Sequence, residues 1–218
     1  MNWVPWVIVG VTSYVLGSIP SGLWIGRLFF GIDVRDYGSK RTGATNVLRT
    51  MGKGAAAGAT AADVLKAVAA VVLARWLMPA QPWAHVLAAI GVAVGHNWPV
   101  FVGFRGGRGV LVSFAATAVL YWPIFVALLL LGIVILWRTR YVSLGSVLGA
   151  ALAPVLFLAA HFNTPDEVPW PYVLYALVGG ALIVAAHKDN IDRLRQGTER
   201  KLGESANREP PGAASPAA

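Results

Sequence analysis

Three short segments of this sequence combine basic residues, glycines and small polar side chains, the residue types that bind phosphate groups. The first segment spans residues 36–54 and reads DYGSKRTGATNVLRTMGKG. Its candidate ligands are hydroxyl, amide and basic side chains: Ser39, Thr42, Thr45, Asn46, Lys40, Arg41 and Arg49. A phosphate accepts hydrogen bonds from several donors at once and needs a fixed cation, so this mixture suits it. The alternative is a basic loop on the inner side of a membrane, with glycines for turns.

A second segment, GHNWPVFVGFRGGRGV at residues 95–110, ends in two arginines and three glycines directly before an apolar run. If that run is a helix, Arg105, Gly106, Gly107 and Arg108 lie at its start, where free N–H groups and the helix dipole attract anions. The same pattern also suits a hinge whose arginines set membrane orientation.

The third segment, HKDNIDRLRQGTERKLG, covers residues 187–203. His187, Asn190 and Arg193 are spaced by three, so they share a face if the segment is helical. His187 and Asp192 also match the H-x4-D pattern of an acyltransferase superfamily in which the histidine is a general base. Two letters make a weak motif, and an FPEG-like companion segment is missing from the sequence.

The composition is that of a membrane protein. Of 218 residues, 56% are hydrophobic and only 13% are charged. The net charge of +8 could indicate a nucleic-acid partner, but basic residues crowd the cytoplasmic loops of membrane proteins, so no nucleic-acid partner is expected. The absence of cysteine excludes disulfides, thiolate metal sites and a cysteine nucleophile.

Seven membrane crossings are predicted, in an all-α polytopic fold. The apolar stretch between Arg108 and Arg138 is too long for one crossing, and arginines at both its ends require an even number of crossings if both ends are cytoplasmic. Pro123 offers the break between two short helices. The predicted spans are 4–26, 55–77, 83–102, 109–121, 123–137, 142–160 and 169–186.

With seven crossings the N-terminus lies outside and the C-terminus lies in the cytoplasm. The outer loop HFNTPDEV then carries two carboxylates and no lysine or arginine, as the positive-inside rule prefers. The three polar segments fall on one cytoplasmic face of the membrane. Residues 1–203 are predicted to form a single integral membrane domain, and the Pro- and Ala-rich residues 204–218 a disordered tail.

Two charged residues lie inside the second predicted span. Asp63 and Lys66 are three residues apart on one helical face, and both are costly in a bilayer unless they pair or face a polar cavity. Either they neutralise each other or they orient the first polar segment. Four scattered histidines form no metal-binding pattern, and neither a P-loop nor a G-x-S-x-G motif occurs, so no metal and no cofactor is expected.

Taken together, GSIPSG, DYGSKRTGATNVLRTMGKG with the following DVLK, GHNWPVFVGFRGGRGV and HKDNIDRLRQGTE resemble the PlsY family of bacterial membrane glycerol-3-phosphate acyltransferases. The resemblance covers about residues 10 to 203. It implies seven membrane helices in the bacterial plasma membrane, with the active site on the cytoplasmic face.

The resemblance implies transfer of a fatty acyl group from acyl phosphate to the 1-hydroxyl of sn-glycerol 3-phosphate, giving 1-acylglycerol 3-phosphate and inorganic phosphate. It implies that Ser39, His187 and Asn190 are catalytic. The implied substrate-binding residues are Thr45, Asn46, Arg49, Arg105, Gly106, Gly107 and Arg108. The donor phosphate itself is expected to take the proton of the glycerol hydroxyl, because an acyl phosphate is already activated and none of the three segments offers a carboxylate–histidine base.

The sequence departs from the family pattern at two places. Lys40 and Arg41 replace a small pair after the serine, and Arg108 stands where the family commonly has the lysine that binds glycerol phosphate. The expected partners are acyl phosphate, sn-glycerol 3-phosphate and membrane lipid. The soluble phosphate acyltransferase that supplies the donor is a further candidate. The alternatives are a thioester-dependent H-x4-D acyltransferase, a small anion transporter and a membrane scaffold.

Overall fold

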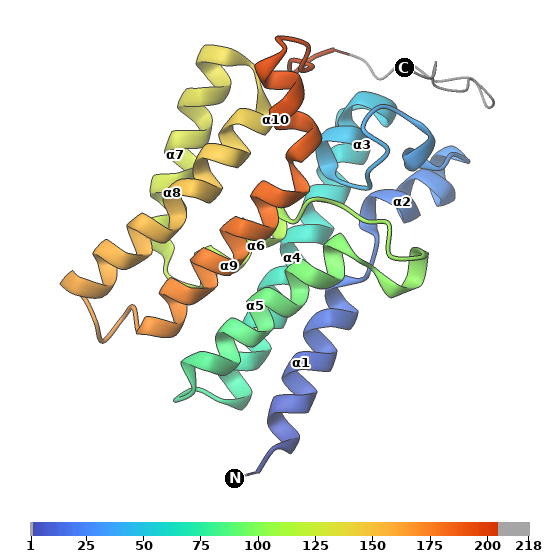
Figure 1. The fold of residues 1–218 in the computed structure, drawn as a ribbon. Coiled ribbons are helices and arrows are strands. Elements are labelled where there is room, and N and C mark those ends of the chain that lie inside the picture. The colour runs from blue at the N-terminus through green and yellow to red at the C-terminus, as the bar shows by residue number, and fades with distance from the viewer. Residues whose placement is uncertain (1, 205–218) are drawn as a thin grey trace.

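The computed structural model describes residues 2–204, and within that range the chain is helical and contains no β-strand (Figure 1). The longer helices are α1 (Val4–Gly17), α4 (Lys53–Leu77), α5 (Pro82–Asn97), α6 (Val110–Leu120), α7 (Trp122–Thr139), α8 (Val142–Asn163) and α9 (Trp170–Ala186). The shorter ones are α2 (Ser21–Ile25), α3 (Ala44–Met51), α10 (Lys188–Arg195), the π-helix η1 (Gly26–Phe30) and the 3-10 helices η2 (Val34–Asp36) and η3 (Val100–Val102).

Five helical segments are long and apolar enough to cross a membrane. They are Val4–Phe30, Lys53–Leu77, Pro82–Val102, Trp122–Thr139 and Val142–Asn163. Helices α9 and α10 make a sixth if they are counted as one span, although the chain bends by 61° between them. The remaining predicted span, 109–121, corresponds to α6, whose 11 residues extend about 16 Å, roughly half of a hydrocarbon core of about 30 Å.

Prolines mark the starts of several of these helices. Pro82 begins α5, and Pro123 and Pro171 lie in the first turns of α7 and α9, where a missing N–H costs nothing. The break predicted at Pro123 is confirmed, since α6 ends at Leu120 and α7 begins at Trp122. The tail prediction for 204–218 lies, except for Glu204, outside the described residues.

Two predicted boundaries are wrong. The first span was expected to be one helix over 4–26, but α1 ends at Gly17, before Pro20, and α2 and η1 continue the apolar segment to Phe30. No helix was predicted between residues 26 and 55, but residues 36–54 contain the eight-residue helix α3. Only Gly52 separates α3 from α4, and its φ of +86° is a conformation that glycine adopts without strain.

Close packing of α1 against α5 depends on glycines. A Cβ atom added to Gly17 would collide with the Val92 carbonyl, and one added to Gly95 would collide with the Tyr14 carbonyl. Small residues of this kind let helix backbones approach closely inside a membrane. Helices α2, α3 and α10 lie together at the end of the bundle opposite the start of α1 (Figure 1), so the polar segments are gathered at one end.

Candidate functional site

A cavity of about 300 Å³ opens at the end of the bundle that carries α3 and α10. It brings together all three polar segments of the sequence. From the first it takes Ser39, Arg41, Gly43, Ala44, Thr45, Asn46 and Arg49; from the second His96, Arg108 and Gly109; and from the third His187, Asn190 and Glu199. Residues of α4, α6 and α8 complete the wall: Thr60, Asp63, Val110, Leu111, Phe114, Val142, Ser143 and Ser146.

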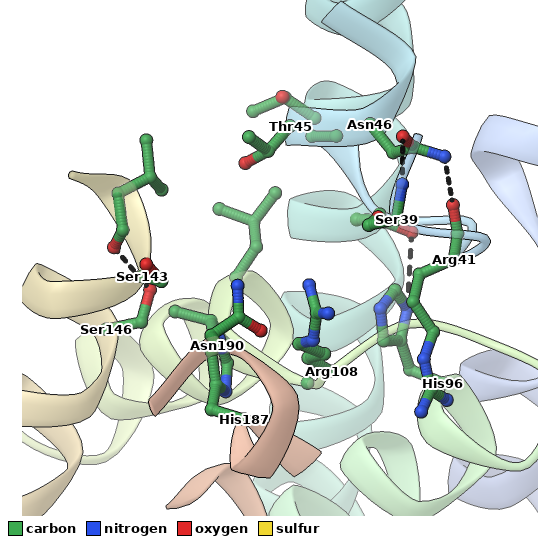
Figure 2. A pocket seen from close by; sticks show the side chains of 18 of the residues that line it. Ser39, Arg41, Thr45, Asn46, His96, Arg108, Ser143, Ser146, His187 and Asn190 are labelled. Carbon is green, nitrogen blue, oxygen red and sulfur yellow. Dashed lines mark hydrogen bonds and ion pairs between the residues drawn. The ribbon is translucent and has the colours of Figure 1, made fainter. Parts of the chain in front are cut away.

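Asn46 organises the first segment. Its Oδ1 accepts a hydrogen bond from the Ser39 N–H at 3.1 Å, and its Nδ2 donates to the Arg41 carbonyl oxygen at 2.9 Å (Figure 2). Nδ2 also donates to the carbonyl oxygens of Val34 and Tyr37, at 2.9 and 3.0 Å. The side chain is 3% exposed. Because its polar atoms are used within the protein, Asn46 shapes the loop around Ser39.

Arg108 lies near the middle of the cavity, between His187 and Asn190 on one side and Arg41 on the other (Figure 2). Its Nε donates to the carbonyl oxygen of Ala186, the last residue of α9, at 3.1 Å. Burial, together with the smaller effect of the nearby charges of Arg41 and Arg193, lowers the pKa of Arg108 to about 10. The guanidinium is still a cation at neutral pH.

Arg49 supplies a second cation from α3. One terminal nitrogen donates to the carbonyl oxygen of Arg200 at 3.1 Å, and its buried Nε has no partner. Burial lowers the pKa of this side chain too, only partly offset by the charge of Glu199. Within residues 2–204 neither Arg49 nor Arg108 forms an ion pair, so both charges are available to an anion.

His187 follows the last residue of α9 and is buried. Its Nδ1 lies 2.8 Å from the Ile183 carbonyl oxygen, which can only accept, so Nδ1 carries the proton and Nε2 is left as an acceptor. Burial lowers the pKa of His187 to about 4, outweighing the hydrogen bond to Ile183, and the charge of Arg108 adds to the lowering. The imidazole is therefore neutral over the physiological pH range.

Glu199, near the end of the third segment, forms hydrogen bonds with residues of both α8 and α10. Its Oε1 accepts from Ser143 Oγ at 2.8 Å and from Asn190 Nδ2 at 2.7 Å, and its Oε2 accepts from Arg193 Nε at 2.7 Å. These hydrogen bonds lower the pKa of Glu199 despite the opposing effect of burial. A carboxylate thus joins two helices at the wall of the cavity.

Asp63 of α4 also lines the cavity, and it is paired with Lys66 behind the cavity wall. Lys66 Nζ lies 2.8 Å from Asp63 Oδ1, donates to the Ile19 carbonyl oxygen at 2.7 Å and lies 3.1 Å from His96 Nδ1. Ser21 Oγ also donates to Asp63, at 2.9 Å. Asp63 and Lys66 therefore neutralise each other, which was one of the two alternatives predicted from the sequence. Lys66 also connects α4 to Ile19, between α1 and α2, and to His96 of α5.

The cavity does not include every predicted site residue. Ser39, Thr45, Asn46, Arg49, Arg108, His187 and Asn190 line it, but Arg105, Gly106 and Gly107 do not. The N–H groups of Gly106 and Gly107 donate to the Asn97 and His96 carbonyl oxygens, and Arg105 is exposed. From this stretch, the cavity is lined by Arg108, Gly109 and the first turn of α6, with Val110 and Leu111.

Several lining residues were not among the predicted site residues. Arg41 lines the cavity, whereas its neighbour Lys40 is exposed and lies outside the lining. Of the two basic residues that depart from the family pattern, only Arg41 can therefore face a ligand in the cavity. Ser143 and Ser146 could not be predicted as lining residues from the sequence, because serines are common in apolar helices. Glu199 stood in the third motif, but only the folding of 196–204 back onto α8 gives it a role.

An apolar groove of about 310 Å³ continues from the cavity between α6, α7, α8 and α9. The two share part of their walls, namely Val110, Phe114, Val142 and Ser146. Five glycines line the groove: Gly132, Gly145, Gly149, Gly179 and Gly180. A polar cavity with an apolar extension accommodates an amphiphilic ligand whose charged head and alkyl tail bind in different places.

Within residues 2–204 no three histidine or carboxylate side chains are placed to hold a metal ion. The polar groups that line the cavity include guanidinium groups, a neutral imidazole, and hydroxyl and amide side chains. They can neutralise anionic charge and orient hydroxyl groups.

Comparison with known proteins places the chain in a family. The family described as glycerol-3-phosphate acyltransferase matches residues 7–197. A glycerol-3-phosphate acyltransferase of Synechococcus sp. (strain JA-3-3Ab) is 42% identical over 93% of this chain and 96% of its own length. Glycerol-3-phosphate acyltransferase 2 of Moorella thermoacetica is 44% identical over 91% and 98%.

Solved structures agree with this assignment. The crystal structure of PlsY, an integral membrane glycerol 3-phosphate acyltransferase, in its glycerol 3-phosphate form has a TM-score of 0.83 and 32% identity, covering 91% of this chain and 96% of that one. Its lysophosphatidic acid form has a TM-score of 0.80, 31% identity and a coverage of 91% and 95%. The resemblance found in the motifs is confirmed: this chain belongs to the PlsY family of integral membrane glycerol-3-phosphate acyltransferases.

Proposed function

We propose that this protein transfers a fatty acyl group from acyl phosphate to the 1-hydroxyl of sn-glycerol 3-phosphate, releasing 1-acylglycerol 3-phosphate and inorganic phosphate. The observation that carries the proposal is the joining of a cationic cavity to an apolar groove. The relatives are named as glycerol-3-phosphate acyltransferases, and PlsY was crystallised with glycerol 3-phosphate and with lysophosphatidic acid.

The cations of the cavity suit two phosphate groups. Arg41 and Arg49 from the first segment and Arg108 from the second line it, together with the first turns of α3 and α6. Fixed guanidinium groups and helix starts both favour phosphate. We assign Arg49 and Arg108 to the phosphates of donor and acceptor, with Ser39 and Thr45 as hydrogen-bonding partners.

The apolar groove suits the acyl tail. Each buried CH2 group contributes about 0.8 kcal/mol, so a tail lying between α6 and α9 holds the donor while its phosphate stays in the cavity. Residues Val110 and Val142 belong to both walls and lie where head and tail meet. The reacting carbonyl then lies at this boundary.

The chemistry we propose needs no protein base. The 1-hydroxyl oxygen attacks the acyl carbon, the bond from that carbon to the phosphate oxygen breaks, and the hydroxyl proton goes to the departing phosphate. A histidine whose pKa is lowered to about 4 is a poor base at neutral pH, which favours a role for His187 as a hydrogen-bond acceptor. The arginines stabilise the charge of the phosphates as the acyl carbon is attacked.

The geometry disfavours the H-x4-D alternative. His187 and Asp192 are five residues apart, about 140° around a helix, and within the described chain no hydrogen bond joins them. The His187 Nδ1 that such an aspartate would orient is instead bonded to the Ile183 carbonyl oxygen. Asp192 does not line the cavity.

We further propose seven crossings of a bacterial plasma membrane, with the N-terminus outside and the cavity on the cytoplasmic side. The short α6 would descend from the cavity and return through α7, which keeps the arginines before α6 and after α7 on one side. A cytoplasmic cavity gives access to glycerol 3-phosphate and to a soluble phosphate acyltransferase that makes the donor.

The deciding experiment offers the purified protein glycerol 3-phosphate with palmitoyl phosphate, palmitoyl-CoA or palmitoyl carrier protein in separate reactions. We expect lysophosphatidate from palmitoyl phosphate alone, with release of one inorganic phosphate per product. Product from a thioester alone would refute the proposed donor. No product from any donor would refute the enzymatic assignment and favour an anion transporter.

A further inference from the structure

The carboxylate of Glu199 is the one side chain in the described chain that binds both Asn190 and Ser143. It is 8% exposed, and a turn through Gly197, whose φ is +70°, returns the chain so that Glu199 reaches Asn190 nine residues earlier. The following segment is bonded to the turn between α7 and α8, because Leu202 N–H donates to the Arg140 carbonyl oxygen at 2.7 Å. Glu199 is therefore held in place from both sides.

The charge of Glu199 decides how the Asn190 amide is turned. An ionised carboxylate only accepts hydrogen bonds, so Asn190 must present its Nδ2 to Glu199. The hydrogen bonds to Glu199 lower its pKa and keep it ionised at neutral pH. The Asn190 Oδ1 is then left on the other side of the amide, buried and without a partner in residues 2–204, in a side chain that lines the cavity.

We propose that Glu199 is a positioning residue, which fixes the Asn190 amide so that its Oδ1 accepts a hydrogen bond from a hydroxyl of glycerol 3-phosphate. This inference rests on the proposed function for its substrate. It adds that the orientation of Asn190 is imposed by a carboxylate that itself touches no substrate.

To orient a substrate hydroxyl, the cavity must offer a hydrogen-bond acceptor as well as cations. Its cations are donors and match the phosphate oxygens, whereas a substrate hydroxyl that is to be oriented must donate its hydrogen. Besides His187 Nε2, the unpartnered Asn190 Oδ1 meets that need (Figure 2). If the amide were turned over, its NH2 group would face the hydroxyl hydrogen and the acceptor would be lost.

A double-mutant cycle tests the proposal, because a residue that acts through Asn190 loses its effect once Asn190 is removed. The four proteins are the wild type, Glu199→Ala, Asn190→Ala and the double variant. The measured quantity is kcat/KM for glycerol 3-phosphate with palmitoyl phosphate. We expect each single variant to lose about 10- to 100-fold, as when a buried polar group loses its hydrogen-bond partner, and the double variant to lose at most about twofold more than Asn190→Ala.

Two further variants separate positioning from folding. Glu199→Gln keeps an acceptor oxygen without the charge, so we expect an activity between those of the wild type and Glu199→Ala. Glu204→Ala removes an exposed carboxylate from the same segment, and we expect it to equal the wild type. Melting temperatures in detergent accompany both.

The same four proteins are compared in a second measurement, the affinity for glycerol 3-phosphate, determined by calorimetry without an acyl donor. We expect Glu199→Ala to weaken this binding when Asn190 is present and to leave it unchanged when Asn190 is already replaced by alanine. Equal losses in both backgrounds would overturn the inference. A wild type that forms no lysophosphatidate from palmitoyl phosphate would overturn the proposed function instead, and the calorimetric cycle alone would then decide the role of Glu199.

Discussion

The polar cavity and the apolar groove share a wall but are built by different means. The cavity is assembled from segments far apart in the sequence, and hydrogen bonds such as those of Asn46 and Glu199 hold its side chains in place. The groove is formed by the faces of four consecutive helices, and five glycines are among its lining residues. A change in the cavity should therefore act on chemistry, and a change in the groove on the choice of acyl chain.

Among the cavity residues, replacement of Arg108 is expected to have the largest effect on the reaction. Arg108→Ala should reduce kcat/KM for glycerol 3-phosphate by about 100-fold or more, because a buried cation that binds phosphate is lost. Arg105→Ala is the matched control: its side chain is exposed and does not line the cavity, so we expect a change within about twofold. Initial rates with palmitoyl phosphate measure both.

Equal losses for Arg105 and Arg108 would show that the basic segment attracts substrate by its total charge. In that case both losses should shrink as salt is added, because exposed charges are screened. The loss for Arg108 alone should persist in salt, since its partner is bound within the cavity.

Gly149 provides a test of the groove. A Cβ at Gly149 meets nothing within 4 Å, so Gly149→Leu should place its side chain in the groove without disturbing the fold. Displacing two CH2 groups of the tail costs about 1.6 kcal/mol, which predicts a loss of roughly 15-fold for palmitoyl phosphate and a smaller loss for lauroyl phosphate. The ratio of the two kcat/KM values is the measurement.

Ala151→Leu is the control for this substitution. Ala151 lies on α8 but is exposed and outside the groove, so the same added side chain should leave the ratio unchanged. Equal losses of Gly149→Leu with both donors would show that the tail does not reach this part of the groove.

The smallest expected effect is that of pH on His187. Because burial lowers its pKa to about 4, the imidazole is neutral above about pH 5, and kcat should show no titration from His187 between pH 5.5 and 8. Below pH 5, protonation would add a buried cation beside Arg108 and kcat should fall. An acidic limb near pH 6.5 that disappears in His187→Gln would instead identify His187 as a general base.

Much of the architecture could be predicted from the sequence. Runs of apolar residues, Pro123 and the positions of the arginines gave the helix order and placed the three polar segments together, because hydropathy and proline geometry are local properties. The helix α3 was missed because it lies in a segment rich in glycine and threonine, residues with low helix propensity. The eight residues of α3 begin after the loop that contains Ser39 and end before Gly52.

The site was predicted in part, and the errors have a common cause. Arg105 and Arg108 are both arginines next to glycines, so sequence reasoning assigned both to the substrate. Only the turn that bonds Gly106 and Gly107 to the end of α5 directs Arg108 inward, against Ala186, and leaves Arg105 outside. Similarly, Lys40 and Arg41 are adjacent, yet Arg41 alone lines the cavity.

By itself, the sequence determined that the protein is a helical membrane protein whose polar chemistry is confined to three segments, and its motifs pointed to the family. The tertiary structure decided which cations face the cavity, how Glu199 turns the amide of Asn190, and that the groove runs between α6 and α9. The physical reason is that composition and periodicity act over one or two helical turns. Hydrogen-bond partners and cavity walls come from residues that only folding brings together.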